Sequence, residues 1–427
     1  MSEPSALVSD LDFPTSLVFD EHGGIYVAES GLPFGGATPG GRVWRIEDGV
    51  RTLVAEDLGA PVTGLCWHDD LLFVSEGGPG RITRINPDGS RTVVVDGMPG
   101  PGNYHTNMSV VGPDGKLYFS QGSMSNLGVI GLDAYELGWL RKLPHAFDLP
   151  GYDITLAGVD VTTRDPFSDT PGATLDTGGF VPFGTKTRAG QRIAGTVPCT
   201  AAVLRCDLDG GDLELVAWGL RNAFGLGFLP DGRLLAVDQG ADDRGSRPIG
   251  NAPDALFEVH AGAWYGWPDY VAARPVTDVG FTPTRGPRPT FLLTNHDELP
   301  RPELPLLEFE PHVAATKFAV VPPWAQHAGH LVMSLFGDEA PMCLPAGGPP
   351  RGRDLVRVDP TDWSVQPLEG APRLYRPIDV AFPPGEDTLY VLDFGHFEMS
   401  DTGVQATKGT GRLWQWPAWA TAQQVAA

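Results

Sequence analysis

A pattern of alternating apolar and polar residues recurs six times along the chain. In each copy, one alternation leads into a turn rich in Gly, Pro or Asp, and a second alternation follows and ends on a polar residue. Alternation with a period of two on both sides of a short turn predicts a hairpin of two β-strands. The six copies span residues 14–30, 61–77, 105–122, 221–240, 312–337 and 376–395.

Further short alternations follow these hairpins. A third one, such as GRVWRI or GRITRI, comes after most copies, and in several cases a fourth follows it, such as RTLVAEDL or RTVVVDGM. Four strands repeated at regular intervals form the blade of a β-propeller. The sequence therefore predicts an all-β fold, a six-bladed β-propeller of four-stranded blades. A β-sandwich with six similar hairpins is the competing interpretation.

The two ends of the chain favour the propeller. The last alternation, residues 411–416, has the pattern of a third strand but no fourth strand after it. Residues 6–13 have the pattern of a fourth strand with no blade before them. We expect the two segments to complete one blade, which would close the ring and leave no unpaired edge.

Two long stretches interrupt the repeats, at residues 124–198 and 243–310. Long loops in a compact fold are usually functional or disordered. The aromatic residues of these stretches, as in YGWPDY, favour ordered loops. We therefore expect residues 1–427 to form a single propeller domain in which both insertions wall in a site.

Charge and cysteine content limit the partners and the compartment. The net charge of −23 repels nucleic acid and anionic membranes, so we expect neither as a partner. The acidity is typical of a soluble surface, although acidic channel mouths also attract divalent cations. The first residues do not have the pattern of a signal peptide, and no apolar run has the length of a membrane span. Cys66, Cys199, Cys206 and Cys343 form no CxxC pair, which is typical of free thiols in a reducing compartment, although a pair between Cys199 and Cys206 stays open. We expect a cytoplasmic protein.

The repeat alignment predicts which polar residues meet at one end of the channel. In a propeller, the starts of the innermost strands and the ends of the second strands lie at the same face. Titratable groups that converge in a concavity mark active sites, although polar strand ends are also common for structural reasons. The strand starts are Thr15, Thr63, His105, Arg221, His312 and Arg376, and the second-strand ends are Glu29, Glu76, Gln121, Asp238 and Asp393.

Three features of this set indicate possible roles in catalysis, cofactor binding or metal binding. His105 follows a Gly-rich stretch and is compatible with a general base, a metal ligand or a hydrogen-bonded structural group. Arg221 is suited to an anionic cofactor or a substrate carboxylate, and alternatively to an ion pair with Asp238 or Asp393. The run DQGADDRG from residue 238 offers carboxylates of the kind that calcium prefers, without the spacing of an EF-hand.

Four phrases that contain these residues resemble the glucose/sorbosone dehydrogenase family of quinoprotein six-bladed propellers. They are YHTNMSVVGPDGKLYFSQGS, GLRNAFGLGFLPDGRLLAVDQGADD, PDALFEVHAGAWYGWP and RPIDVAFPPGEDTLYVLD. The resemblance implies an enzyme that oxidises a small molecule, namely a sugar, a polyol or a related hydroxyl or aldehyde substrate. Hydride would pass to pyrroloquinoline quinone (PQQ) in the presence of Ca²⁺ or another divalent metal, and an external acceptor would take the electrons.

The resemblance also implies roles for particular residues. His105 matches the base that takes the proton of the substrate hydroxyl, and Asp238 lies close to the position that orients it. Arg221, Asn222 and Arg376, together with Gln121 at a neighbouring strand end, would bind the cofactor. The predicted metal ligands come from Gly240, Asp242, Asp243 and Asp254, with Glu29 and His312 as further candidates.

Two departures from the family pattern weaken the cofactor assignment. Ile378 stands where the family has a second arginine, and the lysine expected around residues 334–337 is missing. PQQ carries three carboxylates, so losing two cations should weaken its binding unless other groups replace them. The alternative is a PQQ-free, metal-dependent hydrolase or lyase that resembles the lactonase propellers, with Glu29, Asn222 and Asp238, or His105 and His312, as ligands. A non-enzymatic binding propeller is a third interpretation.

Overall fold

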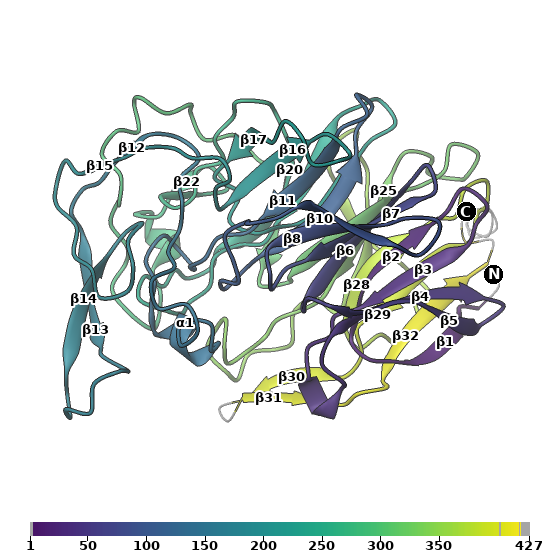
Figure 1. Ribbon diagram of the computed structural model, residues 1–427, viewed down its shortest axis with the longest axis horizontal. Coiled ribbons are helices and arrows are strands. Elements are labelled where there is room, and N and C mark those ends of the chain that lie inside the picture. Colours follow the sequence, from purple (N-terminus) through teal and green to yellow (C-terminus); the bar gives the residue numbers. More distant parts are fainter. Residues whose placement is uncertain (1–2, 401–402, 418, 420–427) are drawn as a thin grey trace.

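Four-stranded antiparallel sheets follow one another along the chain in the computed structural model, which describes residues 3–400, 403–417 and 419. The described residues form six such sheets around a common axis, which confirms the predicted six-bladed propeller (Figure 1). Blade 1 contains β2 (Pro14–Phe19), β3 (Ile25–Glu29), β4 (Gly41–Glu47) and β5 (Val50–Leu58), and blade 2 contains β6 (Val62–His68), β7 (Leu71–Glu76), β8 (Arg81–Ile85) and β9 (Arg91–Val95). Blade 3 contains β10 (Thr106–Val111), β11 (Leu117–Gln121), β16 (Ala202–Cys206) and β17 (Glu214–Trp218), and blade 4 contains β18 (Ala223–Phe228), β19 (Leu234–Asp238), β20 (Pro253–Glu258) and β23 (Leu307–Pro311). Blade 5 contains β24 (Ala315–Val320), β25 (Leu331–Leu335), β26 (Asp354–Val358) and β27 (Val365–Pro367), and blade 6 contains β28 (Pro377–Ala381), β29 (Leu389–Asp393), β32 (Gly411–Trp416) and β1 (Ser5–Leu11).

Blade 6 joins the two ends of the chain. Strand β32 pairs with β29 on one side and with β1 on the other, in a register that sets Leu11 opposite Gly411 and Ala6 opposite Trp414. Figure 1 shows β1, in purple, beside β32, in yellow. The predicted closure is therefore confirmed, and the ring has no break between its first and last blades.

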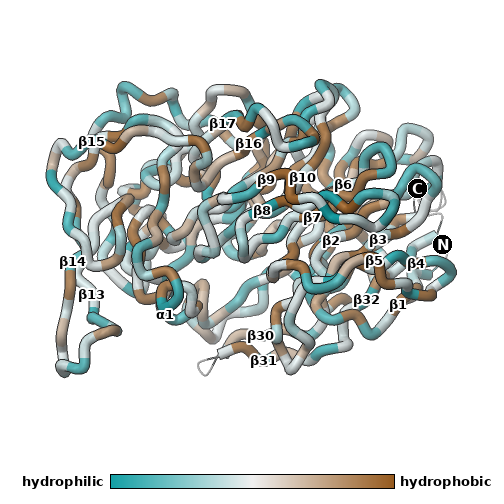
Figure 2. The backbone as a smooth tube through the Cα atoms, viewed as in Figure 1, coloured by the Kyte–Doolittle hydropathy of each residue, from teal (hydrophilic) through white to brown (hydrophobic). Residues whose placement is uncertain are grey.

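The apolar core lies between the blades. Each pair of neighbouring blades encloses its own cluster of buried apolar side chains, because every strand turns its apolar residues toward the next sheet. Between blades 1 and 2, for example, Val43 and Leu58 pack with Val62 and Leu72. Figure 2 shows brown apolar segments along the strands and teal segments in many of the outer turns. All four cysteines are free and buried.

The innermost strands surround the axis of the ring. Strands β2, β6, β10, β18, β24 and β28 contact one another in that order, and β28 returns to β2. Buried polar side chains line this axis, among them Lys317 and Asp379, which form an ion pair. The channel is therefore closed by side chains at this depth, and the candidate site lies nearer to one end.

The two insertions build most of the structure outside the blades. The first lies between β11 and β16 and contains α1 (Leu132–Glu136) and the pairs β12 (Ile154–Thr155) with β15 (Arg192–Ile193) and β13 (Asp160–Arg164) with β14 (Thr174–Gly178). The second range includes β20 and the start of β23, and its loops carry the pair β21 (Tyr270–Val271) with β22 (Arg274–Pro275) and the 3₁₀ turn η2 (Val279–Phe281). The remaining short elements are η1 (Phe34–Gly36) and the hairpin of β30 (Phe397–Ser400) and β31 (Gly403–Ala406). No helix within the described ranges has the length and apolar character needed to cross a membrane.

Candidate functional site

The acidic residues at the second-strand ends hold the loops that lead into their own blades. The Asp238 carboxylate accepts backbone hydrogen bonds from Arg221, at 3.2 Å, and Asn222, at 2.6 Å. These contacts satisfy backbone N–H groups at the point where the loop turns into the first strand. The same arrangement recurs for Glu29 with the N–H of Asp12, for Glu76 with Gly59, and for Asp393 with Tyr375 and Arg376.

Asp254 links blade 4 to blade 5 in a similar way. Its two carboxylate oxygens accept the N–H groups of Gly240, at 2.7 Å, and Ala315, at 2.9 Å. Burial raises the pKa of Asp254 to about 6 and that of Asp238 to about 7. Each oxygen of both carboxylates accepts one backbone hydrogen bond, which fixes the positions of the two side chains.

The Arg221 side chain is saturated by the protein. Its five hydrogen bonds, which account for all of its N–H groups, run to the backbone and side-chain oxygens of Asn126, to the carbonyls of Gln239 and Gly240, and to the Asp242 carboxylate at 2.8 Å. The structure therefore brings Arg221, Gly240 and Asp242 together, and the ion pair of Arg221 is with Asp242 and not with Asp238 or Asp393. It leaves Arg221 with no free donor for an anionic cofactor.

Arg376 is occupied in the same manner. Its guanidinium donates to the carbonyl oxygens of Gly337, Asp338 and Phe397 and to the carboxylate of Glu398, and its side chain is almost fully buried. These contacts tie the loop after β25 to the β30–β31 hairpin. Arg376 thus supports one wall of the channel mouth and directs its donors into that wall.

His105 begins a chain of hydrogen-bonded side chains that crosses three blades. Its Nδ1 atom lies 3.2 Å from the Asn107 side-chain oxygen, Asn107 donates to Asn222 at 2.8 Å, Asn222 donates to Gln239 at 2.8 Å, and Gln239 donates to the Ala315 carbonyl. In this network Nδ1 of His105 carries the proton, which leaves Nε2 as a lone-pair acceptor. Burial lowers the pKa of His105 to about 4, so the ring is neutral at pH 7.

Three other predicted residues lie apart from this network. Gln121 accepts a hydrogen bond from Thr106 and donates to the Pro99 carbonyl, and so fills in blade 3 the position that carboxylates fill elsewhere. The Asp243 carboxylate accepts from the backbone and hydroxyl of Thr284 in the second insertion. Glu29 lies in blade 1 and is not brought together with the other predicted metal ligands.

An inner pocket of about 70 Å³ lies where blades 4 and 5 meet the channel mouth. Five of the predicted residues line it, namely Arg221, Gly240, Asp242, Asp254 and His312. Residues that the sequence reasoning missed complete the lining, among them Tyr104, Arg244, Glu339 and Cys343. Glu339 and Cys343 occur in the segment DEAPMC directly after the fifth repeat, so their position at a second-strand end was the signal that could have identified them.

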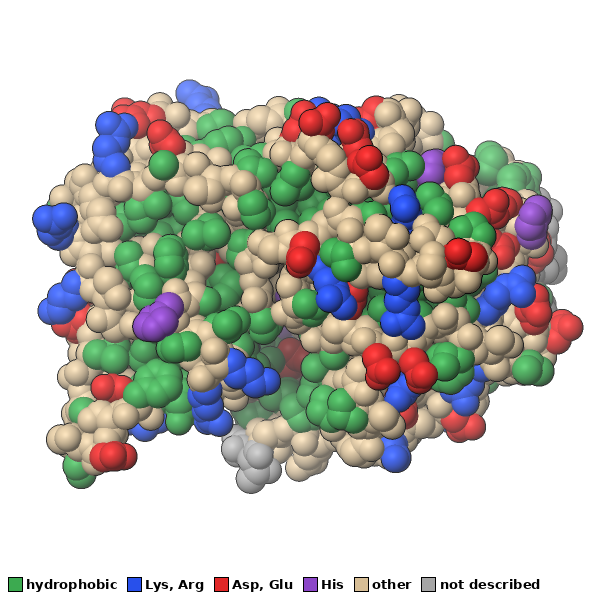
Figure 3. All heavy atoms as spheres, viewed as in Figure 1, with side chains coloured by type: hydrophobic (Ala, Val, Ile, Leu, Met, Phe, Trp, Pro, Cys, Tyr) green, Lys and Arg blue, Asp and Glu red, His purple; other side chains and the backbone are tan. Residues whose placement is uncertain are grey.

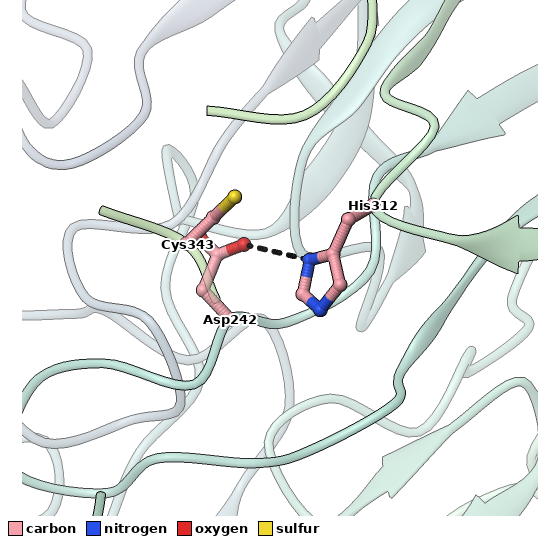
Figure 4. A group of neighbouring side chains, drawn as sticks. All are labelled: Asp242, His312 and Cys343. Atoms are coloured by element: carbon pink, nitrogen blue, oxygen red, sulfur yellow. Dashed lines mark ion pairs between the residues drawn. The ribbon is translucent and has the colours of Figure 1, made fainter. Parts of the chain in front are cut away.

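Asp242 is the best-held side chain of the inner pocket. One carboxylate oxygen lies 2.8 Å from Arg221, 3.1 Å from Arg244 and 3.1 Å from the Tyr104 hydroxyl. The other oxygen lies 3.8 Å from Nδ1 of His312. Figure 4 shows Asp242 and His312 facing each other, with the Cys343 side chain close by and each residue contributed by a different segment.

Glu339 differs from the other carboxylates of the inner pocket. Asp254 is bound by backbone N–H groups, Asp338 accepts the N–H of Arg351 at 2.6 Å, and Asp242 is bound by arginines. Within the described part of the chain, the Glu339 carboxyl forms no hydrogen bond or ion pair. Burial raises its pKa, and the charges of Arg376 and Arg244 oppose that rise. A half-buried carboxyl without a partner inside a pocket is a candidate for proton transfer.

A wider vestibule of about 790 Å³ lies outside the inner pocket and shares Arg244 with it. Its walls include α1, Arg141, Met342 and the β30–β31 hairpin. Figure 3 shows a hollow between these elements near the middle of this face, with acidic atoms at its base. The vestibule is large enough for a small-molecule ligand, and it connects the inner pocket to solvent.

Comparison with known proteins defines the class of fold. No family model matches the sequence, and no curated protein matches it. Among solved structures, the chain is similar to the PQQ-bound aldose sugar dehydrogenase of Streptomyces coelicolor, with 16% identity, coverage of 96% of each chain and a TM-score of 0.56. It is also similar to the PQQ domain of pyranose dehydrogenase from Coprinopsis cinerea, with 15% identity, coverage of 97% of this chain and 95% of that one, and a TM-score of 0.56.

The soluble aldose sugar dehydrogenase of Escherichia coli, in its apo form, is a third such structure, with 14% identity, coverage of 97% and 98%, and a TM-score of 0.53. The resemblance noted in the sequence is therefore confirmed at the level of the fold over almost the whole chain. Identities this low establish the shared fold and leave the reaction to be argued from the site.

The inner pocket does not fit PQQ. The two arginines that the resemblance assigns to the cofactor, Arg221 and Arg376, direct their donors into the protein. Four carboxylates line the pocket, those of Asp242, Asp254, Asp338 and Glu339, and a tricarboxylate would add to their charge. A volume of about 70 Å³ also lies below the range of about 300–1,000 Å³ that is usual for ligand pockets.

Proposed function

We propose that this protein is an oxidoreductase that acts on a hydroxyl group of a small sugar or polyol at the channel mouth. The fold supports the proposal, since the chain shares it over almost its whole length with sugar dehydrogenases. The observation that carries it is His105, whose neutral ring offers Nε2 as a proton acceptor at the predicted strand start. An orienting hydrogen bond on the opposite ring nitrogen is the usual arrangement of a catalytic histidine.

The proposed step removes the two hydrogens of a CH–OH group, the one on oxygen as a proton and the one on carbon as a hydride. The hydroxyl proton passes to Nε2 of His105, and the hydride passes from carbon to a diffusible acceptor of the quinone or dye class. The Asn107 side-chain oxygen accepts a hydrogen bond from Nδ1–H of His105 and stabilises the ring as it becomes charged. Because the inner pocket does not fit PQQ, no step is assigned to that cofactor.

A metal-dependent hydrolase or lyase is the second candidate, and Glu339 is the observation that favours it. A carboxyl group without a partner in an acidic pocket is suited to take a proton from water or from a carbon next to a carbonyl group. In this case His105 would have a structural role, and Glu339 would be the catalytic base.

One set of assays separates the two candidates. The purified chain is tested for dye reduction with a panel of sugars and polyols, with and without PQQ, and for hydrolysis of the corresponding lactones. We expect dye reduction without added PQQ, a loss of about 10²-fold or more in His105→Gln, and no change in His22→Gln, whose side chain is exposed. Activity that strictly requires bound PQQ would contradict the PQQ-free site. Lactone hydrolysis that disappears in Glu339→Gln, without any dye reduction, would favour the second candidate.

A further inference from the structure

The inner pocket contains a group of three side chains with metal-binding atoms. Among residues 3–400, 403–417 and 419, Asp242, His312 and Cys343 form the one group of at least three His, Cys, Asp or Glu residues whose ligand atoms all lie within 4.8 Å of one another. The side chains of Asp242 and His312 are 13% and 6% exposed, and Cys343 is buried. They come from three separate loops, after β19, β23 and β25, so the fold and not local sequence brings them together.

The donor types select a class of metal. Calcium binds six to eight oxygen atoms, and a set with one imidazole and one thiol is unsuited to it. Zinc and related divalent metals bind oxygen, nitrogen and sulfur together, and catalytic zinc sites usually have three protein ligands and one open position. The Asp, His and Cys set therefore matches a transition metal of the zinc class.

The surroundings of the three side chains orient them as ligands. Arg221, Arg244 and the Tyr104 hydroxyl bind one oxygen of Asp242 and leave the other beside His312. Outer contacts of this kind fix the ligands of known metal sites. The Asp242 backbone N–H also donates to Asn126 at 2.9 Å, which fixes the loop after β19.

Two backbone features act on the other two side chains. His312 has a φ of 66°, in the left-handed region, where histidine is among the non-glycine residues that are enriched. The backbone N–H of Glu339 donates to the Cys343 sulfur at 3.2 Å. This contact fixes the position of the Cys343 side chain beside the pocket.

The charge of the inner pocket favours a cation at this point. Four carboxylates line the pocket, against the guanidinium groups of Arg221 and Arg244. A divalent ion between Asp242, His312 and Cys343 would offset this excess of negative charge. Its open coordination position would face the space that Glu339 also borders.

We propose that Asp242, His312 and Cys343 bind one divalent transition metal of the zinc class at the floor of the inner pocket. The metal site goes beyond the proposed reaction, because the same three side chains would bind the metal whether the substrate is oxidised or hydrolysed. In either reaction the ion would supply a Lewis acid that polarises a substrate oxygen.

Binding of cobalt to the full chain tests the proposal directly. The protein is stripped with a chelator and titrated with Co²⁺, and the near-ultraviolet absorption is followed. We expect one equivalent to bind and a sulfur-to-cobalt charge-transfer band to appear, and we expect Zn²⁺ to displace the cobalt whereas excess Ca²⁺ does not. Absence of the band, or displacement by Ca²⁺ at equal concentration, would overturn the proposal.

Substitutions identify the ligands. Cys343→Ser should abolish the charge-transfer band, and His312→Gln should weaken metal binding by about tenfold or more. Cys66→Ser is the matched control, because Cys66 is also a buried free thiol but lies outside the pocket, and it should leave both unchanged. A band that persists in Cys343→Ser would overturn the proposal. The wild-type spectrum tests the proposal if a variant does not fold. Intact metal binding in a chain without dye-reducing or lactonase activity would contradict the proposed function alone.

Discussion

Replacement of Lys317 by methionine tests how the channel is closed. The Lys317 ammonium lies 2.9 Å from the carbonyl oxygen of Thr15, 3.0 Å from that of Thr63 and 3.2 Å from the Asp379 carboxylate. The Lys317 and Asp379 side chains are 3% and 5% exposed. One cation on β24 thus joins blades 1, 2 and 6 across the axis, and methionine keeps most of its volume while it removes the charge.

The expected cost follows from what the substitution leaves behind. Removing one partner of a buried ion pair costs about 3–5 kcal/mol, because the remaining charge stays buried. Asp379 keeps the backbone N–H of Leu17, at 2.8 Å, and the Ser16 hydroxyl, so we expect a value near the lower end, about 3 kcal/mol. The two carbonyl oxygens that lose a charged donor keep the cost from falling below that value.

The loss should depend on pH in a defined direction. Burial raises the pKa of Asp379, and Lys317 opposes that rise, so the substitution raises the pKa further. A carboxyl with a raised pKa contributes stability below its unfolded value and loses that contribution as the pH rises through its folded value. The deficit of Lys317→Met should therefore be smaller at pH 5 than at pH 8.

Urea unfolding of the two single variants and the double variant, Lys317→Met with Asp379→Asn, measures the coupling. We expect the double variant to recover about 1–2 kcal/mol of the sum of the single losses. Arg274→Met is the control, since Arg274 and Glu308 form a surface pair with 43% and 40% exposed side chains and should cost less than about 1 kcal/mol. Equal losses in Lys317→Met and Arg274→Met, or additive single effects, would refute the reasoning.

Three further outcomes can be measured on the same protein. Burial lowers the pKa of His105 to about 4, so its contribution to stability is complete above pH 6.5 and is lost as the pH falls toward 4. Between pH 7 and pH 4.5, the unfolding free energy of His105→Gln, measured by urea titration, should therefore fall by about 1–3 kcal/mol less than that of the wild type. Asp393→Ala leaves the N–H groups of Tyr375 and Arg376 without an acceptor and should cost about 2–4 kcal/mol by chemical unfolding, whereas Asp393→Asn should recover part of the loss. Deletion of residues 1–11 removes β1 and exposes the edge of β32, so the chain should melt at a lower temperature and aggregate, and a monomer with unchanged melting would contradict the role of that strand.

The repeat pattern was sufficient to predict the architecture. Period-two alternation and short turns report local strand geometry directly, so all six hairpins and the closure of blade 6 follow from them. The outer strand of blade 4, β23 at Leu307–Pro311, was missed because its short sequence LEFEP follows a Pro-rich stretch and ends on proline itself. Strand prediction fails there because pairing with β20, and not local propensity, makes that segment a strand.

The sequence located the mouth of the channel but did not reveal which side chains there are free. Arg221, Asp238 and Arg376 occupy the expected end of the ring, yet their polar atoms are bound by the backbone and by neighbouring loops. Hydrogen-bond partners of this kind are contributed by residues up to about a hundred positions away, and no alignment of the repeats within one chain contains them. Saturation of donors and acceptors is a property of the folded state.

The acids at repeated strand ends have structural roles, and the residues that line the inner pocket have other roles. The second-strand acids of blades 1, 2, 4 and 6 share one role, since each binds a backbone N–H at the start of its own blade. A role that recurs in four of the six blades is architectural. Asp242, Glu339 and Cys343 lie beyond the repeated strand ends, whereas His312 occupies a repeated strand start, and all four residues line one pocket. A propeller that closes by repetition can vary the loops beyond its strand ends without loss of the ring, so function is expected where the repeat is broken. The mouth of this channel is therefore best probed at those four residues.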